Sequence, residues 1–333
     1  MNFKAIGASD KVEGFCLVKR CEVKTSMKGA KYMDLVLTDK SGEIDAKYWD
    51  YQEGVTIVFK ENSIVKVRGT LDQFRGAPQL RVELIRPALA SDNINPADYV
   101  AAAEYDSEAM YQEIISIAED FRDEDLKLLL EAVYTKYKDR LLYYPAAVRL
   151  HHAMRGGLLY HTLSIMRMAQ KACEIYPSID PDLLLCGAAL HDLGKLEEMD
   201  ANELGIAGKY TTDGNLIGHL VRGTIMVHDV AAEIGTPAEK VELLEHMLIS
   251  HHGKPEFGSA VRPMFLEAHV LSLLDELDAK VYEIADIVSG IEPGDFSQRI
   301  WSLDDTRLYN HGRKEELKPE ANLMDKTEEN FHV

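Results

Sequence analysis

Hydrophobic and polar residues alternate in five short segments within the first 90 residues of this 333-residue chain. The segments are 14–18, 32–37, 42–49, 63–69 and 79–85, with turn-forming residues at 28–29, 39–42 and 75–78. Alternation with a period of two is typical of strands that bury one face. Five strands in about 80 residues suit a small closed barrel, and the commonest five-stranded one is the OB-fold. We therefore expect an all-β OB-fold domain over residues 1–90, with Phe15 in its core.

The apolar spacing changes to that of helices after Pro87 and the polar segment 91–96. Apolar residues recur at i, i+3 and i+4 in segments 106–119, 123–137, 158–176, 181–190, 219–234, 237–250 and 263–288. A capping residue precedes proline at Asp180 and at Thr236, as is typical of helix starts. Strand-like alternation of any length is absent from this part of the sequence. We expect an all-α domain over residues 91–312 and a loosely held polar tail over 313–333.

The charge of the chain divides unevenly between these two regions. The whole chain has 37 Lys and Arg against 56 Asp and Glu, a net charge of −19, which by itself argues against a polyanionic partner such as nucleic acid. Residues 1–90 hold 15 basic and 12 acidic residues, whereas residues 91–333 hold 22 and 44. The first region is thus mildly basic and the second strongly acidic. We expect nucleic acid to bind the barrel and any cation site, and to bind weakly elsewhere.

Cysteine spacing and hydropathy indicate the cellular compartment in which the protein is expected. Cys16, Cys21, Cys173 and Cys186 form no CxxC pair, so neither a disulfide framework nor a zinc ribbon is expected. No stretch approaches the roughly 18 apolar residues of a transmembrane helix, and the first residues lack the apolar core of a signal peptide. These features favour a cytoplasmic protein that makes no membrane contact.

Histidines gather in the helical region, beside carboxylates at helix ends. Ten of the twelve histidines fall between positions 151 and 269. His191 and Asp192 directly follow an apolar helix that Gly194 ends. A histidine would complement the dipole at that end, but an aspartate is disfavoured there unless a cation offsets its charge. Because imidazole and carboxylate are ligands of divalent Mn, Fe, Co and Zn, the pattern indicates a metal site.

Several motifs resemble the H…HD…D signature of HD-domain metal-dependent phosphohydrolases. They are His161 within 156–162, the adjacent His191 and Asp192, and Asp275 within 273–280. In addition, His219 and the adjacent pair at 251–252 match the extra histidines of HD proteins that hold two metals. The resemblance covers about residues 145–290, with five motifs in the family's order.

A barrel followed by an HD domain is similar to the YhaM-type 3′→5′ exoribonucleases. Strings at 251–258, 277–280, 298–301 and 304–309 also resemble that family's own, so the resemblance spans roughly residues 12–309. It implies an enzyme that hydrolyses single-stranded RNA, or single-stranded DNA, from the 3′ end. The products would be nucleoside 5′-monophosphates, released by attack of a metal-bound hydroxide.

The same resemblance implies two divalent metal ions, with Mn expected and Co or Fe as alternatives. One ion would be held by His161, His191, Asp192 and Asp275. The second would be held by His219, His251 and His252, with Asp192 bridging. Adjacent histidines cannot share a helical face unless the helix ends there, and which of the pair at 251–252 ligates stays open.

The catalytic residues implied are His191, Asp192 and Lys195. Lys195 lies one turn after His191 and can offer its ammonium to a phosphate oxygen, although a solvated lysine is an equal alternative. His152 precedes the turn at 156–157 and is a further candidate for contact with the substrate phosphate.

Aromatic and basic residues interleave in the barrel region. OB-folds bind single strands by stacking bases on aromatic side chains along a basic groove. Tyr48 and Trp49 are adjacent, so one of them faces outward if both lie in a strand. The substrate contacts expected from this region are Lys47, Tyr48, Trp49, Phe74 and Arg75.

Two other functions stay open on the sequence alone. Other HD-domain enzymes hydrolyse small nucleotides or cyclic dinucleotides, in which case the barrel would serve assembly or regulation. The third alternative is an RNA-binding adaptor with an inactive HD site, and the complete set of matched ligands argues against it. The apolar helices also leave a homo-oligomer open, without fixing its symmetry.

Overall fold

The computed structural model describes residues 3, 10–39, 41–74, 76–148 and 152–313. The chain forms two compact units, Met1–Ser272 and Leu273–Val333. No helix within the described ranges is long and apolar enough to cross a membrane. Arg75 and the tail from residue 314 onward, both part of the sequence-based predictions, lie outside the described residues.

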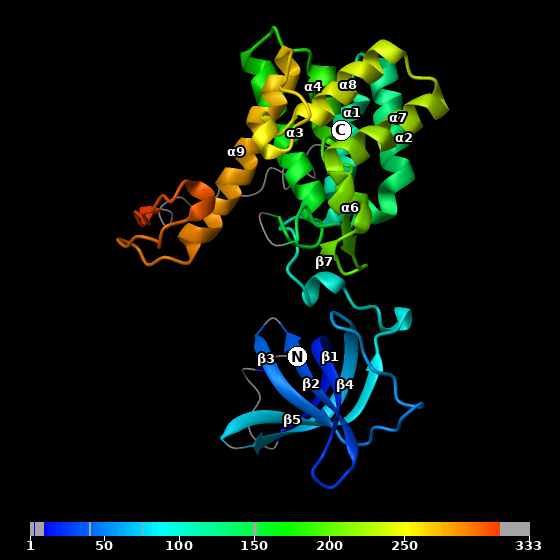
Figure 1. The fold of residues 1–333 in the computed structure, drawn as a ribbon, viewed down its shortest axis with the longest axis vertical. Helices are drawn as coiled ribbons and strands as arrows, with labels where there is room; N and C mark the ends of the chain where they lie inside the picture. Colours follow the sequence, from blue (N-terminus) through cyan, green and yellow to red (C-terminus); the bar gives the residue numbers. More distant parts are fainter. Residues whose placement is uncertain (1–2, 4–9, 40, 75, 149–151, 314–333) are drawn as a thin grey trace, which may run out of the picture. The chain divides into compact units, whose positions relative to one another are not determined.

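Five strands near the N-terminus close into a barrel in the order β1-β2-β3-β5-β4 (Figure 1). Their bounds are β1 Lys11–Thr25, β2 Lys31–Asp39, β3 Gly42–Tyr48, β4 Ile64–Phe74 and β5 Ala77–Pro87. Strands β3 and β5 pair in parallel and the other neighbours pair antiparallel. The predicted OB-fold class is confirmed.

Strand β1 is longer than its alternating segment because it serves two neighbours. Its first half pairs with β4, and its second half pairs with β2 after an irregularity between Val18 and Arg20. Such a bulge shifts the side-chain alternation and bends the strand, as closure of a barrel requires. The alternating pattern therefore identified only part of β1.

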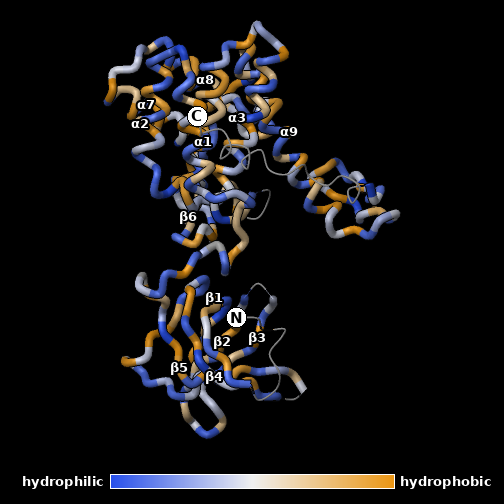
Figure 2. The backbone as a smooth tube through the Cα atoms, turned by 180° about the vertical axis from the view of Figure 1, so that it is seen from behind, coloured by the Kyte–Doolittle hydropathy of each residue, from blue (hydrophilic) through white to orange (hydrophobic). Residues whose placement is uncertain are grey.

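Side chains of all five strands fill the barrel, which Figure 2 shows as hydrophobic positions recurring along each strand. Met33, Leu35, Leu37 and Leu80 have no exposed surface. Phe15, expected in this core, is half-exposed instead. It precedes fully buried Cys16 in β1 and so faces outward, where the ammonium of Lys66 lies 5.7 Å from the ring centroid.

The remaining described residues are mainly helical, as predicted. The longer helices are α1 Ser107–Glu119, α2 Glu124–Leu141, α3 Gly157–Ile175, α4 Pro181–Leu190, α7 Gly218–Ile234, α8 Ala238–Ser250 and α9 Leu266–Ser289. Short elements join α4 to α7: α5 Lys195–Glu198, strands β6 Met199–Ala201 and β7 Ala207–Tyr210, and α6 Thr212–Leu216. The β6–β7 hairpin is an addition to the all-α prediction, because strands of three and four residues are too short to produce a recognisable alternation.

Helix α4 lies at the centre of the helical part, where it packs against α1, α2, α3 and α8. It is buried from Asp182 to Leu190. Its start is as predicted, since Asp180 accepts hydrogen bonds from two backbone N–H groups and Pro181 occupies the first turn. Because α4 is buried throughout, the residues that follow Leu190 emerge inside the domain. At α8 the predicted cap is wrong: Pro237 itself is the cap residue, since its extended backbone delays the first turn to Ala238.

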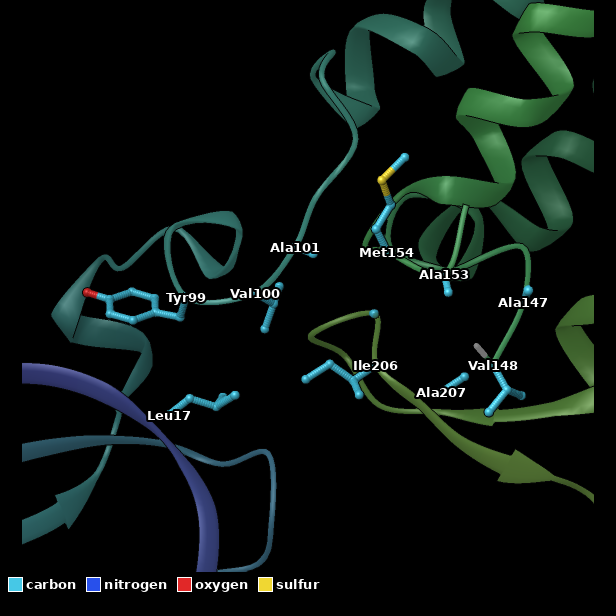
Figure 3. A pocket seen from close by; sticks show the side chains of 11 residues that line it. Leu17, Tyr99, Val100, Ala101, Ala147, Val148, Ala153, Met154, Ile206 and Ala207 are labelled. Atoms are coloured by element: carbon cyan, nitrogen blue, oxygen red, sulfur yellow. The ribbon is translucent and has the colours of Figure 1, made fainter. Parts of the chain in front are cut away.

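A cavity of about 270 Å³ lies in the first unit (Figure 3). Most of its lining is apolar: Leu17, Tyr99, Val100, Ala101, Ala147, Val148, Ala153, Met154, Gly205, Ile206 and Ala207. Among the described residues that line it there is no charged side chain and no predicted site residue. The cavity is therefore separate from the candidate site.

His246 on α8 fixes the segment that leads into α9. Its Nε2 accepts a hydrogen bond from the backbone N–H of Met264 at 3.0 Å, and its ring centroid lies 5.2 Å from that of Phe265. Accepting at Nε2 requires that this nitrogen carry no proton. Burial favours the same neutral form, because it lowers the pKa of His246 below the ordinary value.

Replacing His246 should make the stability of the protein less sensitive to acid. As the pH falls below the ordinary histidine pKa of about 6.5, the unfolded chain binds a proton that the folded chain does not, so the free energy of unfolding decreases. Urea unfolding at pH 7.5 and pH 5.5 should show a smaller decrease for His246→Asn than for the wild type, by up to about 1 kcal/mol. Parallel decreases in the two proteins would contradict this role.

Candidate metal centre

Asp192 lies at the end of α4, with both of its oxygens directed at histidines. Its side chain is 2% exposed and that of His191 is fully buried. The Oδ2 atom lies 3.4 Å from Nε2 of His191 and 3.4 Å from Nε2 of His161, which α3 contributes. Oδ1 accepts no hydrogen bond from the described part of the chain. These three side chains are close enough to share one metal ion.

The other oxygen of Asp192 faces a second group of histidines. Oδ1 lies 3.5 Å from Nε2 of His219 on α7 and 3.7 Å from Nε2 of His251. The Nε2 atoms of His219 and His252 are 3.2 Å apart. Helix α8 ends at Ser250, as the adjacent histidines required, and His219, His251 and His252 are close enough together to hold a second ion.

The hydrogen bonds of the outer ring nitrogens fix which tautomer each histidine adopts. Nδ1 lies 2.8 Å from the carbonyl of Ala188 in His191, 2.7 Å from that of Leu248 in His251 and 2.8 Å from that of Phe257 in His252. A carbonyl oxygen accepts only, so each Nδ1 carries the proton and each neutral ring directs a lone pair from Nε2 inward.

Lone pairs that face each other need a cation between or beside them. The Nε2 lone pairs of His219 and His252 face each other at 3.2 Å, and the Nε2 atoms of His161 and His191 lie 3.3 Å apart. Nitrogen lone pairs gathered around a buried carboxylate form a set of electron-pair donors, which is the arrangement that divalent metals bind. The residues therefore fit divalent ions on both sides of Asp192.

Lys195 contributes the positive charge nearest to this carboxylate. Its Nζ lies 2.6 Å from Oδ2 of Asp192, and its side chain is 12% exposed. Burial alone would raise the pKa of Asp192, but the Lys195 ammonium holds it well below the ordinary value. Asp192 is consequently ionised, as a metal ligand must be.

Two other predicted site residues of the helical part, His152 and Asp275, lie in different units. His152 is 1% exposed, its ring centroid lies 5.3 Å from that of His161, and its backbone adopts a left-handed φ of 55°. It thus adjoins the first histidine group, and its contact with a substrate stays a prediction. Asp275 lies on α9 within the second unit, and its part in the metal centre stays a prediction.

The predicted substrate contacts of the barrel lie around the end of β3. Trp49 is 48% exposed and stacks on Tyr32, with ring centroids 4.4 Å apart. Tyr48 instead packs against the barrel core. The ammonium of Lys47 is ion-paired with buried Asp34 and lies 5.8 Å from the Tyr32 centroid. At the end of β4, Phe74 is 57% exposed.

Comparison with known proteins gives matches in both regions. A model of the HD domain matches residues 158–280, and a model of an OB-fold nucleic acid binding domain matches residues 12–88. A Listeria monocytogenes protein named 3′-5′ exoribonuclease YhaM is 36% identical over 90% of this chain and 95% of its own. A Bacillus subtilis protein of the same name is 32% identical over 90% and 95%.

The chain belongs to the YhaM family of 3′-5′ exoribonucleases. Similarity that covers 90% of this chain includes the barrel and the metal centre together. Among solved structures, the second OB-fold domain of replication protein A from Methanococcus maripaludis is 20% identical over 26% of this chain and 94% of that domain, with a TM-score of 0.21.

Glu198 is a part of the centre that the sequence-based interpretation missed. Its Oε1 accepts hydrogen bonds from the backbone N–H of His219 at 3.1 Å and from its Nδ1 at 2.9 Å. This carboxylate therefore orients the ring and directs the Nε2 lone pair inward. The sequence offers no signal for it, because neighbouring Glu197 is equally acidic but pairs with Arg140 instead.

Gly194 lets α5 and α7 approach closely enough to place His219. A Cβ at this position would lie 2.0 Å from the carbonyl oxygen of His219 and 2.6 Å from the amide nitrogen of Gly223. Both are backbone atoms of α7, so the helix itself would have to move. The glycine after the His–Asp pair is thus required by the packing of α5 against α7, whereas α4 already ends at Leu190 and not at Gly194 as predicted.

Gly194→Ala should displace His219 and weaken the metal centre. We expect a loss of about 1–3 kcal/mol in the free energy of unfolding, as for other overpacked sites, and weaker Mn binding. Gly208→Ala is the matched control, because a Cβ there would meet no atom within 4 Å. Urea unfolding and Mn titration calorimetry measure the two effects. Equal behaviour of the two variants would show that the close approach does not position His219.

Proposed function

We propose that this chain degrades single-stranded RNA from the 3′ end and releases nucleoside 5′-monophosphates. The observation that carries the proposal is Asp192, whose two oxygens each face a separate group of histidines. Relatives named 3′-5′ exoribonuclease, similar over 90% of the chain, support the same reaction. Single-stranded DNA is a second substrate to be tested beside RNA.

We assign two divalent metal ions to the centre, with Mn as the metal to test first. His161, His191, Asp192 and, from the sequence, Asp275 would hold one ion. His219, His251 and His252 would hold the other, with Asp192 shared. Such ions supply Lewis acidity, which lowers the pKa of a water and draws charge from phosphate oxygens.

The residues of the chain supply orientation and electrostatics around these ions. Backbone carbonyls and Glu198 hold the imidazole rings in the tautomer that ligation requires. Lys195 keeps Asp192 ionised and can also place its ammonium against a non-bridging phosphate oxygen. The burial of His161, His191 and Asp192 excludes bulk water, which strengthens each of these interactions.

We assign the capture of longer strands to the barrel face around Trp49. Exposed Trp49 and its partner Tyr32 form a stacked pair that a base can extend. Lys24 and Lys47 share Asp34, so their ammonium groups stand at this face. Stacking tolerates every base, which suits an enzyme that removes nucleotides in succession.

We also propose that the protein works in a reducing compartment such as the cytoplasm. All four cysteines are free thiols. Burial raises the pKa of Cys16 to about 12, which disfavours the reactive thiolate.

Removal of either central ligand should abolish RNA hydrolysis. Asp192→Asn and His191→Gln each take a donor from the centre, so we expect activity to fall by more than about a hundredfold and bound Mn to decrease. The assay follows 5′-labelled RNA with a free or a blocked 3′ end, and wild-type enzyme should shorten only the former. His269→Gln, at an exposed position of α9, is the control. Wild-type hydrolysis of small nucleotides or cyclic dinucleotides without RNA degradation would contradict the proposal.

The two tryptophans of the chain allow a matched test of the barrel. Trp49→Ala should weaken binding of a long single strand by roughly 5- to 100-fold, as the loss of one stacked base does. The effect should appear in KM rather than in kcat. Trp301→Ala removes a side chain that is 81% exposed in the second unit and should leave KM unchanged. An equal effect of the two substitutions would refute the assignment of strand capture to this face.

A further inference from the structure

Arg155 differs from the other half-buried arginines of the described residues. Each of the others is ion-paired with a carboxylate: Arg86 with Asp92, Arg140 with Glu197, Arg167 with Glu113 and Arg222 with Asp213. Arg155 is half-buried too, yet no carboxylate of the described residues lies within ion-pair distance of it. A charge that is partly removed from water without a partner costs free energy.

Neighbouring groups hold the Arg155 guanidinium in place without neutralising it. One Nη donates a hydrogen bond to the carbonyl of Glu203 in the β6–β7 turn, and the guanidinium carbon lies 5.8 Å from the Tyr143 ring centroid. The guanidinium has five N–H donors. Among the described residues, only the donor bonded to Glu203 has an acceptor. Burial lowers the pKa of Arg155, and neighbouring Tyr143 offsets only part of this effect.

The backbone of Arg155 is fixed on both sides. Its N–H donates to the carbonyl of Ala101 at 2.9 Å, and its carbonyl accepts from the N–H of Ala103 at 2.9 Å. The β6–β7 turn fits closely against it, since a Cβ on Gly205 would lie 2.7 Å from the Arg155 Cα. The side chain therefore starts from a rigid position.

Arg155 is also close in sequence to residues at the metal centre. It follows His152 by three residues and immediately precedes Gly156, the residue that caps α3, the helix of His161. The ring of His152 in turn lies 5.3 Å from that of His161. Residues 91–333 carry twice as many acidic as basic residues, yet none of the described carboxylates is ion-paired with this half-buried guanidinium.

We propose that Arg155 binds an internucleotide phosphate of the RNA, on the 5′ side of the linkage that is cleaved. This inference rests on the proposed function and names a contact within it. A guanidinium matches the geometry of a phosphate and can donate two hydrogen bonds to it. A 3′ end held at the buried centre leaves the rest of the strand to extend toward solvent on its 5′ side, and half-exposed Arg155, three residues after buried His152, is our candidate for the phosphate contact there.

Arg155→Gln should raise KM for RNA roughly tenfold, as expected for one charge-assisted contact. The slope of the logarithm of KM against the logarithm of the salt concentration should fall by about 0.7, which corresponds to one phosphate contact on a single strand. Arg262→Gln removes the same charge from an exposed position of the same region and should change neither quantity. Arg155→Lys should recover part of the affinity, because it restores the charge without the fork.

A set of RNAs, each with one neutral methylphosphonate linkage, identifies the phosphate. The linkage that Arg155 contacts should cost the wild type about tenfold in KM and the Arg155→Gln variant nothing further. An equal KM increase for the variant at every linkage, or an unchanged salt slope, would overturn the assignment, whether or not the urea midpoint shifts. If the wild type degrades no RNA at all, the proposed function fails and this contact fails with it.

Discussion

A buried carboxylate sets the requirements for the rest of this molecule. Asp192 is 2% exposed and ionised, and a lone negative charge in that environment would cost several kcal/mol. Lys195 offsets part of this charge. The four histidines nearest to the carboxylate oxygens add lone pairs rather than positive charge while they are neutral. The protein thus assembles an arrangement that cations complete, so metal binding and folding stability are coupled.

The packing of the backbone fixes this arrangement more than contacts among the ligating side chains do. The buried helix α4 delivers His191 and Asp192 to the interior, and α8 ends where its two histidines begin. The close approach of Gly194 to α7 sets the position of His219. Carbonyl oxygens then orient the rings. Because helix ends and glycine contacts are rigid, the ligands need little reorganisation when ions bind.

The candidate ligands could be predicted from the sequence because the pattern that indicates them lies in neighbouring residues. An aspartate is unusual at the C-terminal end of a helix, and the adjacent His191 and Asp192 show this feature directly in the sequence. Glu198 and Arg155 could not be found in this way, since their roles depend on which residues approach from elsewhere in the chain. Glu197 and Glu198 are identical in type, and folding alone gives one to Arg140 and the other to His219. In the barrel, the alternation predicted the strands, but Phe15 was misplaced, because Val12, Cys16 and Val18 form the inward face of β1.

Ion pairing also changes the meaning of the charge difference between the two regions. Most of the described cations of the mildly basic barrel are ion-paired, and several of these pairs are exposed: Lys19 with Glu43, Lys31 with Glu53 and Arg81 with Asp72. Exposed pairs of this kind contribute little stability, so a phosphate can replace the carboxylate at small cost. Such exchange would give loose, sequence-tolerant binding, which we propose is strengthened by stacking on Trp49. In the acidic region, the guanidinium of Arg155 extends from a fixed backbone and is ion-paired with no carboxylate of the described residues. The barrel is therefore suited to holding the strand and the helical region to positioning it.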